Sequence, residues 1–193
     1  YKVVSILTNN GLICKDSSLF YVNVTPQVSI SSSSPVCSND TLTISEHGGN
    51  ATSWTWTSNG NATIISINDS SSQVVGMTDG EIFSVYVEDD DGCSNTATTT
   101  IQVNPKPTNV TSTDYGTYCS SSPIFPLTGG SPGGGYYSGV GVSNNNYDAS
   151  SVGYGSSIEN VDILYIYSDA NGCKDTSISQ VTVQKAPDCL LYT

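Results

Sequence analysis

The chain has 193 residues, with 17 carboxylates against five basic residues, all of them lysine, and a formal net charge of −12. Nucleic-acid-binding proteins neutralise phosphates with clustered Lys and Arg, so this acidic balance excludes a nucleic-acid partner. No stretch approaches the roughly 20 apolar residues that span a bilayer, and we therefore expect no membrane span.

The first 25 residues have the pattern of a β-hairpin. Residues 2–7 favour a rising strand, Asn10-Gly11 favours a tight turn with positive φ, and residues 19–24 favour a descending strand. A lone two-stranded hairpin is not stable in water. We therefore predict that residues 1–25 are the C-terminal hairpin of an incomplete β-sandwich module, which either upstream strands or another chain completes.

Residues 26–104 are predicted to form a complete module. Apolar and polar residues alternate with a period of two in most of its segments, turn residues separate these segments, and no stretch has helical periodicity. This pattern is typical of an antiparallel β-sandwich in which each sheet has one solvated face. The expected strands are 28–30, 41–44, 53–57, 64–67, 83–87 and 98–103.

Residues 105–184 are predicted to form a second module of the same kind. Its middle, residues 127–142, is rich in glycine, and we interpret these glycines as turn and bulge positions. A phosphate-binding loop is excluded because neither the helix nor the lysine that such a loop requires follows. Pro-containing joints at 25–27 and 104–107 predict semi-rigid connections, and residues 185–193 are a linker-like tail.

The cysteines recur with the modules. Cys14, Cys93 and Cys173 each follow a Gly-containing turn and recur about every 80 residues, which is the length of one small sandwich. Cys37 and Cys119 open the two complete modules, 56 and 54 positions before the next of these turn cysteines. The matching spacing predicts two in-module disulfides, Cys37–Cys93 and Cys119–Cys173, and an oxidising compartment.

A metal site is the alternative interpretation of these cysteines. Zinc motifs need closely spaced Cys/His pairs, whereas these cysteines are far apart and His47 is the only histidine. Cys14 and Cys189 have no in-module mate. Truncation of a longer protein explains both, and a bond between Cys189 of one chain and Cys14 of the next would instead build a covalent fibre.

The densest acidic cluster is Asp89-Asp90-Asp91 at one predicted turn. Oxygen ligands in an acidic turn suit Ca²⁺, but the twelve-residue spacing of an EF-hand loop is absent. We therefore interpret the cluster as a solvated hairpin tip and expect no cofactor, with Ca²⁺ binding as the alternative. Calcium is the only cofactor for which the sequence offers candidate ligands.

Catalytic motifs are missing. The single histidine leaves the second module without a Ser-His-Asp set, and no nucleophile-elbow or metalloprotease motif occurs. Asp148, Glu159 and Asp162 fit a glycosidase by residue type, but acids scattered over a sandwich are usually solvated. We therefore predict that the chain is not an enzyme.

Five aromatic residues offer a binding alternative. Exposed on one surface, they would form a platform for the sugar rings of surface glycans. Inward-facing core aromatics are the more common arrangement in a sandwich. The five residues are Trp54, Trp56, Tyr136, Tyr137 and Tyr147.

Residues 127–142, followed by Asp169-Ala-Asn-Gly-Cys173, resemble the PKD-like and Ig-like repeats of large Bacteroidetes surface proteins. Residues 35–40, 54–56 and 90–93 look like a more divergent version of the same repeat. Residues 187–193 resemble the linker before the gliding-motility-associated sorting domain of type IX secretion. Asp40-Thr41-Leu42 resembles a Bacteroidetes O-glycosylation site at Thr41.

This resemblance implies tandem Ig-like or PKD-like sandwiches in a beaded array. The implied protein is a secreted cell-surface adhesin or extracellular filament whose segment gives reach, stiffness and attachment. Its partners would be neighbouring modules or identical subunits, with assembly through strand complementation by the N-terminal hairpin. The alternative function is a carbohydrate-binding accessory module of a secreted enzyme.

Overall fold

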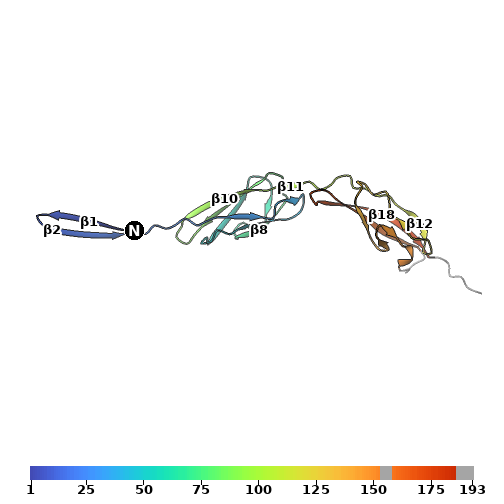
Figure 1. Cartoon of the computed structure of the whole chain (residues 1–193), viewed down its shortest axis with the longest axis horizontal. Helices are drawn as coiled ribbons and strands as arrows, with labels where there is room; N and C mark the ends of the chain where they lie inside the picture. The colour runs from blue at the N-terminus through green and yellow to red at the C-terminus, as the bar shows by residue number, and fades with distance from the viewer. Residues whose placement is uncertain (153–157, 186–193) are drawn as a thin grey trace, which may run out of the picture. The chain divides into compact units, whose positions relative to one another are not determined.

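The structure, a computed structural model, describes residues 1–152 and 158–185 and confirms an all-β fold (Figure 1). Within these ranges the regular elements are strands and a single 3₁₀ turn, η1 (Ala149–Ser151). None of these elements is a helix long and apolar enough to cross a membrane. The chain divides into unit 1, Tyr1–Val103, and unit 2, Asn104–Thr193.

The N-terminal hairpin consists of β1 (Lys2–Asn9) and β2 (Leu12–Leu19), which pair along their whole length. Asn10 and Gly11 form the turn with φ of 46° and 83°, as the Asn-Gly pair predicts. The descending strand was predicted at residues 19–24, but it begins immediately after the turn because a two-residue loop continues both strands in register. In the described part of the chain, no further strand pairs with β1 or β2.

The rest of unit 1 is a sandwich of two main sheets. One sheet has the order β10-β9-β6 and the other β3-β5-β8-β7, while β4 pairs with β11 at the boundary of the unit. The strands are β3 (Ile30–Ser32), β4 (Val36–Cys37), β5 (Leu42–Glu46), β6 (Ser53–Ser58), β7 (Thr63–Ile64), β8 (Ser71–Val75), β9 (Ile82–Glu88), β10 (Ser94–Thr100) and β11 (Val103–Asn104).

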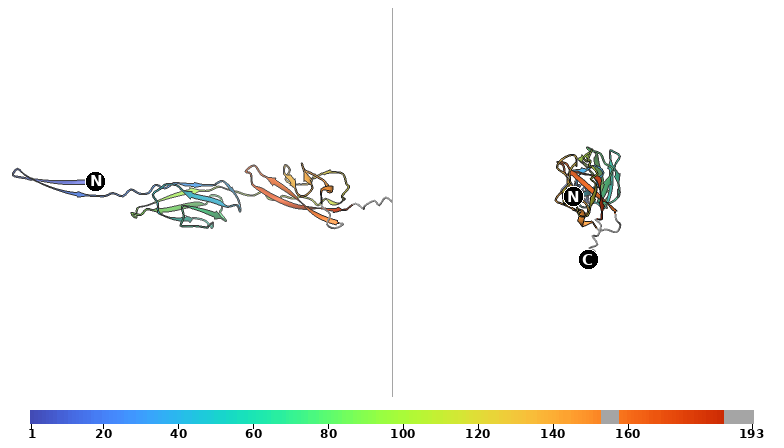
Figure 2. Two further views of the ribbon diagram at one scale, coloured as in Figure 1. Left: turned by 90° about the horizontal axis from the view of Figure 1, so that it is seen from below. Right: turned by 90° about the vertical axis from the view of Figure 1, so that its right-hand side faces the viewer.

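The core of unit 1 lies between these sheets (Figure 2). Alternate residues of β9 point inward, so Phe83, Val85 and Val87 are fully buried, and Leu42 and Ile44 of β5 face them from the other sheet. Period-two alternation in the sequence therefore places one apolar face of each sheet against the other.

Unit 2 also has two sheets. The larger has the order β12-β18-β17-β14 and the smaller β13-β16-β15. Among the described residues of unit 2, β12 pairs with β18 in parallel, and the other strand pairs are antiparallel. The strands are β12 (Gly116–Cys119), β13 (Phe125–Pro126), β14 (Tyr136–Ser138), β15 (Val142–Ser143), β16 (Asn146–Tyr147), β17 (Ile158–Ser168) and β18 (Lys174–Gln184).

Tyr165 of β17 explains part of the glycine-rich segment. Its hydroxyl donates to the Pro132 carbonyl and accepts from the Gly135 N–H at 2.9 Å. A Cβ at Gly130 or Gly135 would overlap the Tyr165 ring. Turn positions with positive φ occur in this segment as predicted, for example at Gly129. The sequence did not show that two of its glycines make room for an aromatic ring.

Candidate functional site

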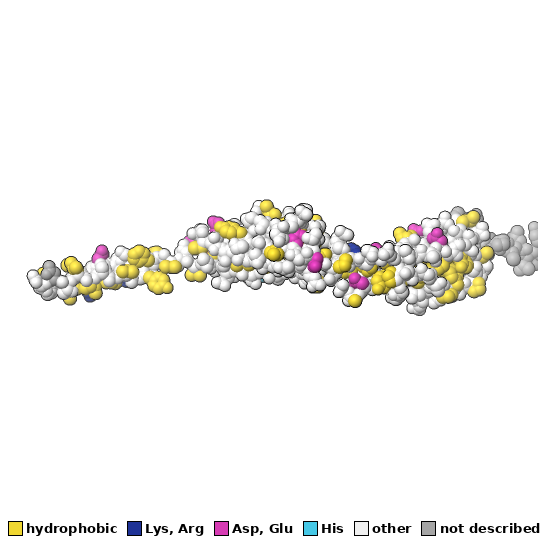
Figure 3. All heavy atoms as spheres, turned by 90° about the horizontal axis from the view of Figure 1, so that it is seen from above, with side chains coloured by type: hydrophobic (Ala, Val, Ile, Leu, Met, Phe, Trp, Pro, Cys, Tyr) yellow, Lys and Arg dark blue, Asp and Glu magenta, His cyan; other side chains and the backbone are white. Residues whose placement is uncertain are grey.

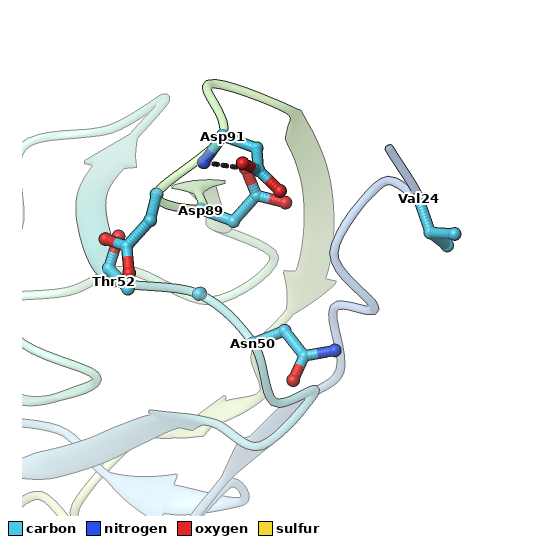
Figure 4. Close-up of a pocket in the computed structure, with 7 residues that line it drawn as sticks. Val24, Asn50, Thr52, Asp89 and Asp91 are labelled. Carbon is cyan, nitrogen blue, oxygen red and sulfur yellow. Dashed lines mark hydrogen bonds between the residues drawn. The ribbon is translucent and has the colours of Figure 1, made fainter. Parts of the chain in front are cut away.

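The hairpin tip between β9 and β10 carries Asp89, Asp90 and Asp91, the candidate calcium ligands of the alternative interpretation. Asp89 Oδ1 accepts a hydrogen bond from the backbone N–H of Asp91 at 3.1 Å (Figure 4). It accepts a second from the backbone N–H of Cys93 at 2.8 Å. An open hollow of about 470 Å³ lies beside this tip and is lined also by Asn50 and Thr52. The Asp89 carboxylate is therefore engaged in shaping its own turn.

The corresponding tip of unit 2, between β17 and β18, has the same geometry without the acidic cluster. Asp169 Oδ1 accepts from the backbone N–H groups of Asn171 and Cys173, both at 2.9 Å. The geometry that the two tips share needs only one Asp. We therefore interpret Asp89 as a structural residue. Across residues 1–152 and 158–185, three or more potential metal ligands nowhere gather into a group that could hold an ion.

The cysteines differ from the predicted pairing. Cys37 and Cys173 are each disulfide-bonded, whereas Cys14, Cys93 and Cys119 are free thiols. The predicted in-module bonds Cys37–Cys93 and Cys119–Cys173 are therefore wrong in this structure. Cys14 is an exposed free thiol, and the prediction for Cys189 lies outside the described residues.

The in-module bonds fail because each unit places its two cysteines at opposite ends. In unit 2, Cys119 is paired with Gln184 at the last residue of β18, whereas Cys173 directly precedes the first. Eleven strand residues at about 3.3 Å each separate these ends by roughly 35 Å. A disulfide requires Cα atoms within about 7 Å.

The free Cys93 thiol is poorly suited to reaction. Burial raises its pKa, and the carboxylates of Asp89 and Asp91 raise it further. The thiolate is the nucleophilic form, so a raised pKa lowers reactivity. The raised pKa therefore disfavours the thiolate form of Cys93 at this tip.

The N-terminal hairpin exposes residues whose counterparts are buried elsewhere. Counting eight and ten positions from the turn cysteine gives Ile101 and Val103 in unit 1 and Val181 and Val183 in unit 2, all buried. The same count from Cys14 gives two valines that are 66% and 79% exposed. These two residues are Val22 and Val24.

The exposure extends along the hairpin on both faces, and Figure 3 shows hydrophobic side chains over much of its length. Burying one such side chain stabilises a protein by about 1.5 to 3 kcal/mol. A surface of this kind is typical of an interaction site. The exposed residues with large apolar side chains are Tyr1, Val3, Val4, Ile6, Leu7, Leu12, Ile13, Leu19, Phe20, Tyr21, Val22 and Val24.

The five aromatic candidates do not gather on an exposed surface. Trp56 and Tyr147 are buried in the cores of their units, and Trp54 and Tyr137 are half-buried against those cores. Tyr136 is the exposed member of the five. The aromatic residues thus mainly serve packing, in line with the core interpretation of the sequence.

Two buried carboxylates escaped the sequence analysis. Glu46 accepts hydrogen bonds from Trp54 Nε1 at 3.1 Å, Ser29 N at 3.2 Å and Gly48 N. Burial raises its pKa, but these hydrogen bonds outweigh burial and leave the pKa below its ordinary value. The period-two alternation of the strand could have identified Glu46, since Leu42, Ile44 and Glu46 are alternate residues that all face inward.

Glu81 has a similar environment just before β9. It accepts from Thr78 N at 2.9 Å, Ala62 N at 3.1 Å, Thr78 Oγ1 at 3.2 Å and the Ser58 hydroxyl. Burial raises its pKa, and the donors, Ser58 foremost, lower it by more. Both carboxylates tie loops to the sandwich and have no neighbouring catalytic partner among their hydrogen-bond donors.

Of the remaining candidates, Glu159 and Asp162 line one surface hollow, and Thr41 and Asp148 do not. Thr41 is exposed immediately before β5, so its hydroxyl is accessible as the predicted glycosylation site requires. Asp148 caps η1 by accepting from Ser150, and Asp162 Oδ1 accepts from Gln180 Nε2 at 2.9 Å. Glu159 lies on β17 and lines a surface hollow with Asp162.

No family model matches the chain, and no curated protein matches it. Solved structures with a similar chain course include a bacterial ice-binding adhesin of 1.5 MDa, with a TM-score of 0.39 and 16% identity, covering 96% of this chain and 74% of that one. A Ca²⁺-stabilised adhesin of an Antarctic bacterium has a TM-score of 0.39 and 14% identity and covers 97% and 57%.

The Ig1-2 module of the Drosophila receptor tyrosine phosphatase DLAR is a further example. Its TM-score is 0.31 at 8% identity, covering 85% of this chain and all of that chain. TM-scores this low do not establish a shared fold. The all-β architecture therefore follows from the strands and their pairing in this chain.

Proposed function

We propose that this chain is a structural segment of a secreted cell-surface adhesin or extracellular filament, giving reach, stiffness and attachment without catalysis. Each unit devotes its aromatic and aliphatic residues to a packed core. The surface is rich in neutral polar side chains, and only 11% of all residues are charged. A disulfide-forming compartment is consistent with export.

The exposed hairpin carries the proposal. Val22 and Val24 are solvent-exposed, although the residues at the same distance from Cys93 and Cys173 are core residues. We infer that the hairpin adds its strands to an exposed sheet edge of a neighbouring module or an identical subunit. Main-chain pairing along an exposed edge and burial of the valine face would together supply the affinity.

The sequence resemblance adds a finer proposal. Tandem Ig-like or PKD-like modules at residues 26–104 and 105–184 would belong to a Bacteroidetes surface protein of the gliding-motility type, exported by type IX secretion. Thr41 would carry an O-glycan. Mass spectrometry of the protein from its natural source tests the glycan directly, because a modified Thr41 peptide is heavier by the mass of the sugar.

Self-association of the full chain tests the assembly proposal. Light scattering coupled to size-exclusion chromatography is expected to show oligomers that grow with concentration, and V22E/V24E should abolish them. Ile178 is an exposed residue of unit 2, so I178E is a matched control that should leave association unchanged. A monomer at every concentration, or equal loss in both variants, would contradict assembly through the hairpin.

Carbohydrate binding is the alternative function, and it has less support because Trp56 and Tyr147 are buried. A glycan array probed with the full chain separates the two. Binding that Tyr136→Ala removes would favour the carbohydrate-binding module, since Tyr136 is the exposed candidate. Silence on the array would leave the structural role.

A further inference from the structure

The two faces of the N-terminal hairpin differ in charge. Residues that pair across β1 and β2 lie on the same face, and so do alternate residues of one strand. Lys2 and Lys15 therefore share one face, the lysine face, which carries no carboxylate, whereas Asp16 lies on the other. The lysines and large apolar side chains of the lysine face are all exposed, and they are Lys2, Val4, Ile6, Ile13, Lys15 and Leu19.

The rest of the chain has the opposite charge. Residues 1–24 contain two of the five lysines and one of the 17 carboxylates, so residues 25–193 keep 16 carboxylates against three lysines. Opposite charges attract two surfaces toward each other, and like charges oppose their contact. The lysine face therefore fits an acidic and apolar surface on a second copy of this chain.

Unit 2 has an acidic and apolar hollow beside β17. Its volume is about 520 Å³, both Glu159 and Asp162 line it, and none of its lining residues is basic. Val140, which is 60% exposed, and the half-buried Leu164 add apolar surface to the lining. The hollow thus combines the two properties that complement the lysine face.

The hollow also borders an uncovered part of a strand edge. β18 flanks β17 on one side, and β14 flanks it on the other at Leu164–Ile166. Among the described strand pairs, none lies beside Asn160–Asp162 on the β14 side. An edge of this kind accepts an added strand through main-chain hydrogen bonds. Ile178 lies on β18, across β17 from this side, and does not line the hollow.

We propose that the hairpin of one chain docks along Asn160–Asp162 of a second copy. This contact rests on the assembly proposed above and specifies its acceptor surface. The lysine face lies on the side of the sheet where Asp162 is exposed, so that opposite charges are cross-strand neighbours. A strand continued to residue 24 places Val22 and Val24 on the other side, where Val161 is buried.

The proposed contact is head-to-tail. Each chain gives its hairpin to one neighbour and its hollow to another, and such a contact builds open chains of subunits unless it closes into a ring. Blocking either surface on every chain therefore stops growth. Blocking the hairpin on one chain and the hollow on another leaves one usable pair of surfaces.

Complementary variants of the full chain test the proposal. V22E/V24E blocks the hairpin, and E159K/D162K reverses the charge of the hollow and should raise the Kd of association about tenfold or more. Light scattering coupled to size-exclusion chromatography should show each variant alone as a monomer and their equimolar mixture as a 1:1 dimer that grows no further. K2E/K15E combined with E159K/D162K restores opposite charges and should restore oligomers. A mixture that stays monomeric would overturn the contact.

A matched control separates this contact from general charge effects. D90K/D91K makes the same charge change at the hollow beside the β9–β10 tip, whose apolar lining consists of Val24 and Ala51, and it should leave association unchanged. Undiminished oligomers of E159K/D162K, or equal loss in D90K/D91K, would overturn the β17 hollow as acceptor and leave assembly through the hairpin standing. An unmodified chain that is monomeric at every concentration would contradict that assembly and this contact together.

Discussion

Glu81 is a carboxylate with only 3% of its surface exposed, and its carboxylate oxygens accept hydrogen bonds from Ser58, Ala62 and Thr78. In E81Q, the amide turns a donor toward groups that also donate. Hydrogen bonds to charged groups contribute about 1.5 to 3 kcal/mol each, so we expect a loss of about 2 to 3 kcal/mol from unit 1. Urea unfolding followed by tryptophan fluorescence measures it, and the exposed D90N is the control that should change little.

The same carboxylates make unit 1 sensitive to acid. The folded-state pKa values of Glu46 and Glu81 lie below the ordinary 4.5, so their stabilising contribution is present above that pH and is lost as the pH falls through the folded pKa values. The urea midpoint of unit 1 should therefore decrease as the pH is lowered below about 4.5. E46Q/E81Q should flatten this dependence, and an equally steep fall in the double variant would contradict the assignment.

Gly130 is required for space and not for an unusual φ. A Cβ there would overlap the Tyr165 ring, whereas a Cβ at Gly133 would meet no atom within 4 Å. We expect G130A to destabilise unit 2 by about 1 to 3 kcal/mol and G133A to be nearly neutral. Tyrosine circular dichroism during urea unfolding compares the two, and equal effects would show that the ring shifts freely.

At the scale of elements, the residues eight positions after the three turn cysteines contrast in burial, since Ile101 and Val181 are buried and Val22 is exposed. V181A removes methyl groups from a fully buried site and should cost about 2 kcal/mol, whereas V22A alters an exposed residue and should cost less than about 0.5 kcal/mol in the monomer. Urea midpoints measured at low protein concentration test this. A large cost for V22A in the monomer would mean that the hairpin packs on this chain.

Periodicity predicted strands well where one face is apolar, as in β9, whose residues Phe83, Val85 and Val87 alternate with polar neighbours. It missed β8, because Ser71–Val75 begins with polar residues and one of them, Ser72, is buried. It also could not show that β12 runs parallel to β18, since pairing direction depends on contacts distant in sequence.

At the scale of the whole molecule, cysteine spacing was informative about recurrence but not about bonding. The intervals of 56 and 54 residues are nearly equal, but they do not tell which end of a sandwich each cysteine occupies. That depends on the parallel pairing that carries Cys119 to Gln184 and on the contact between Asn104 and Cys173. The hairpin's exposed valines were foreseeable, because a two-stranded ribbon cannot enclose a core.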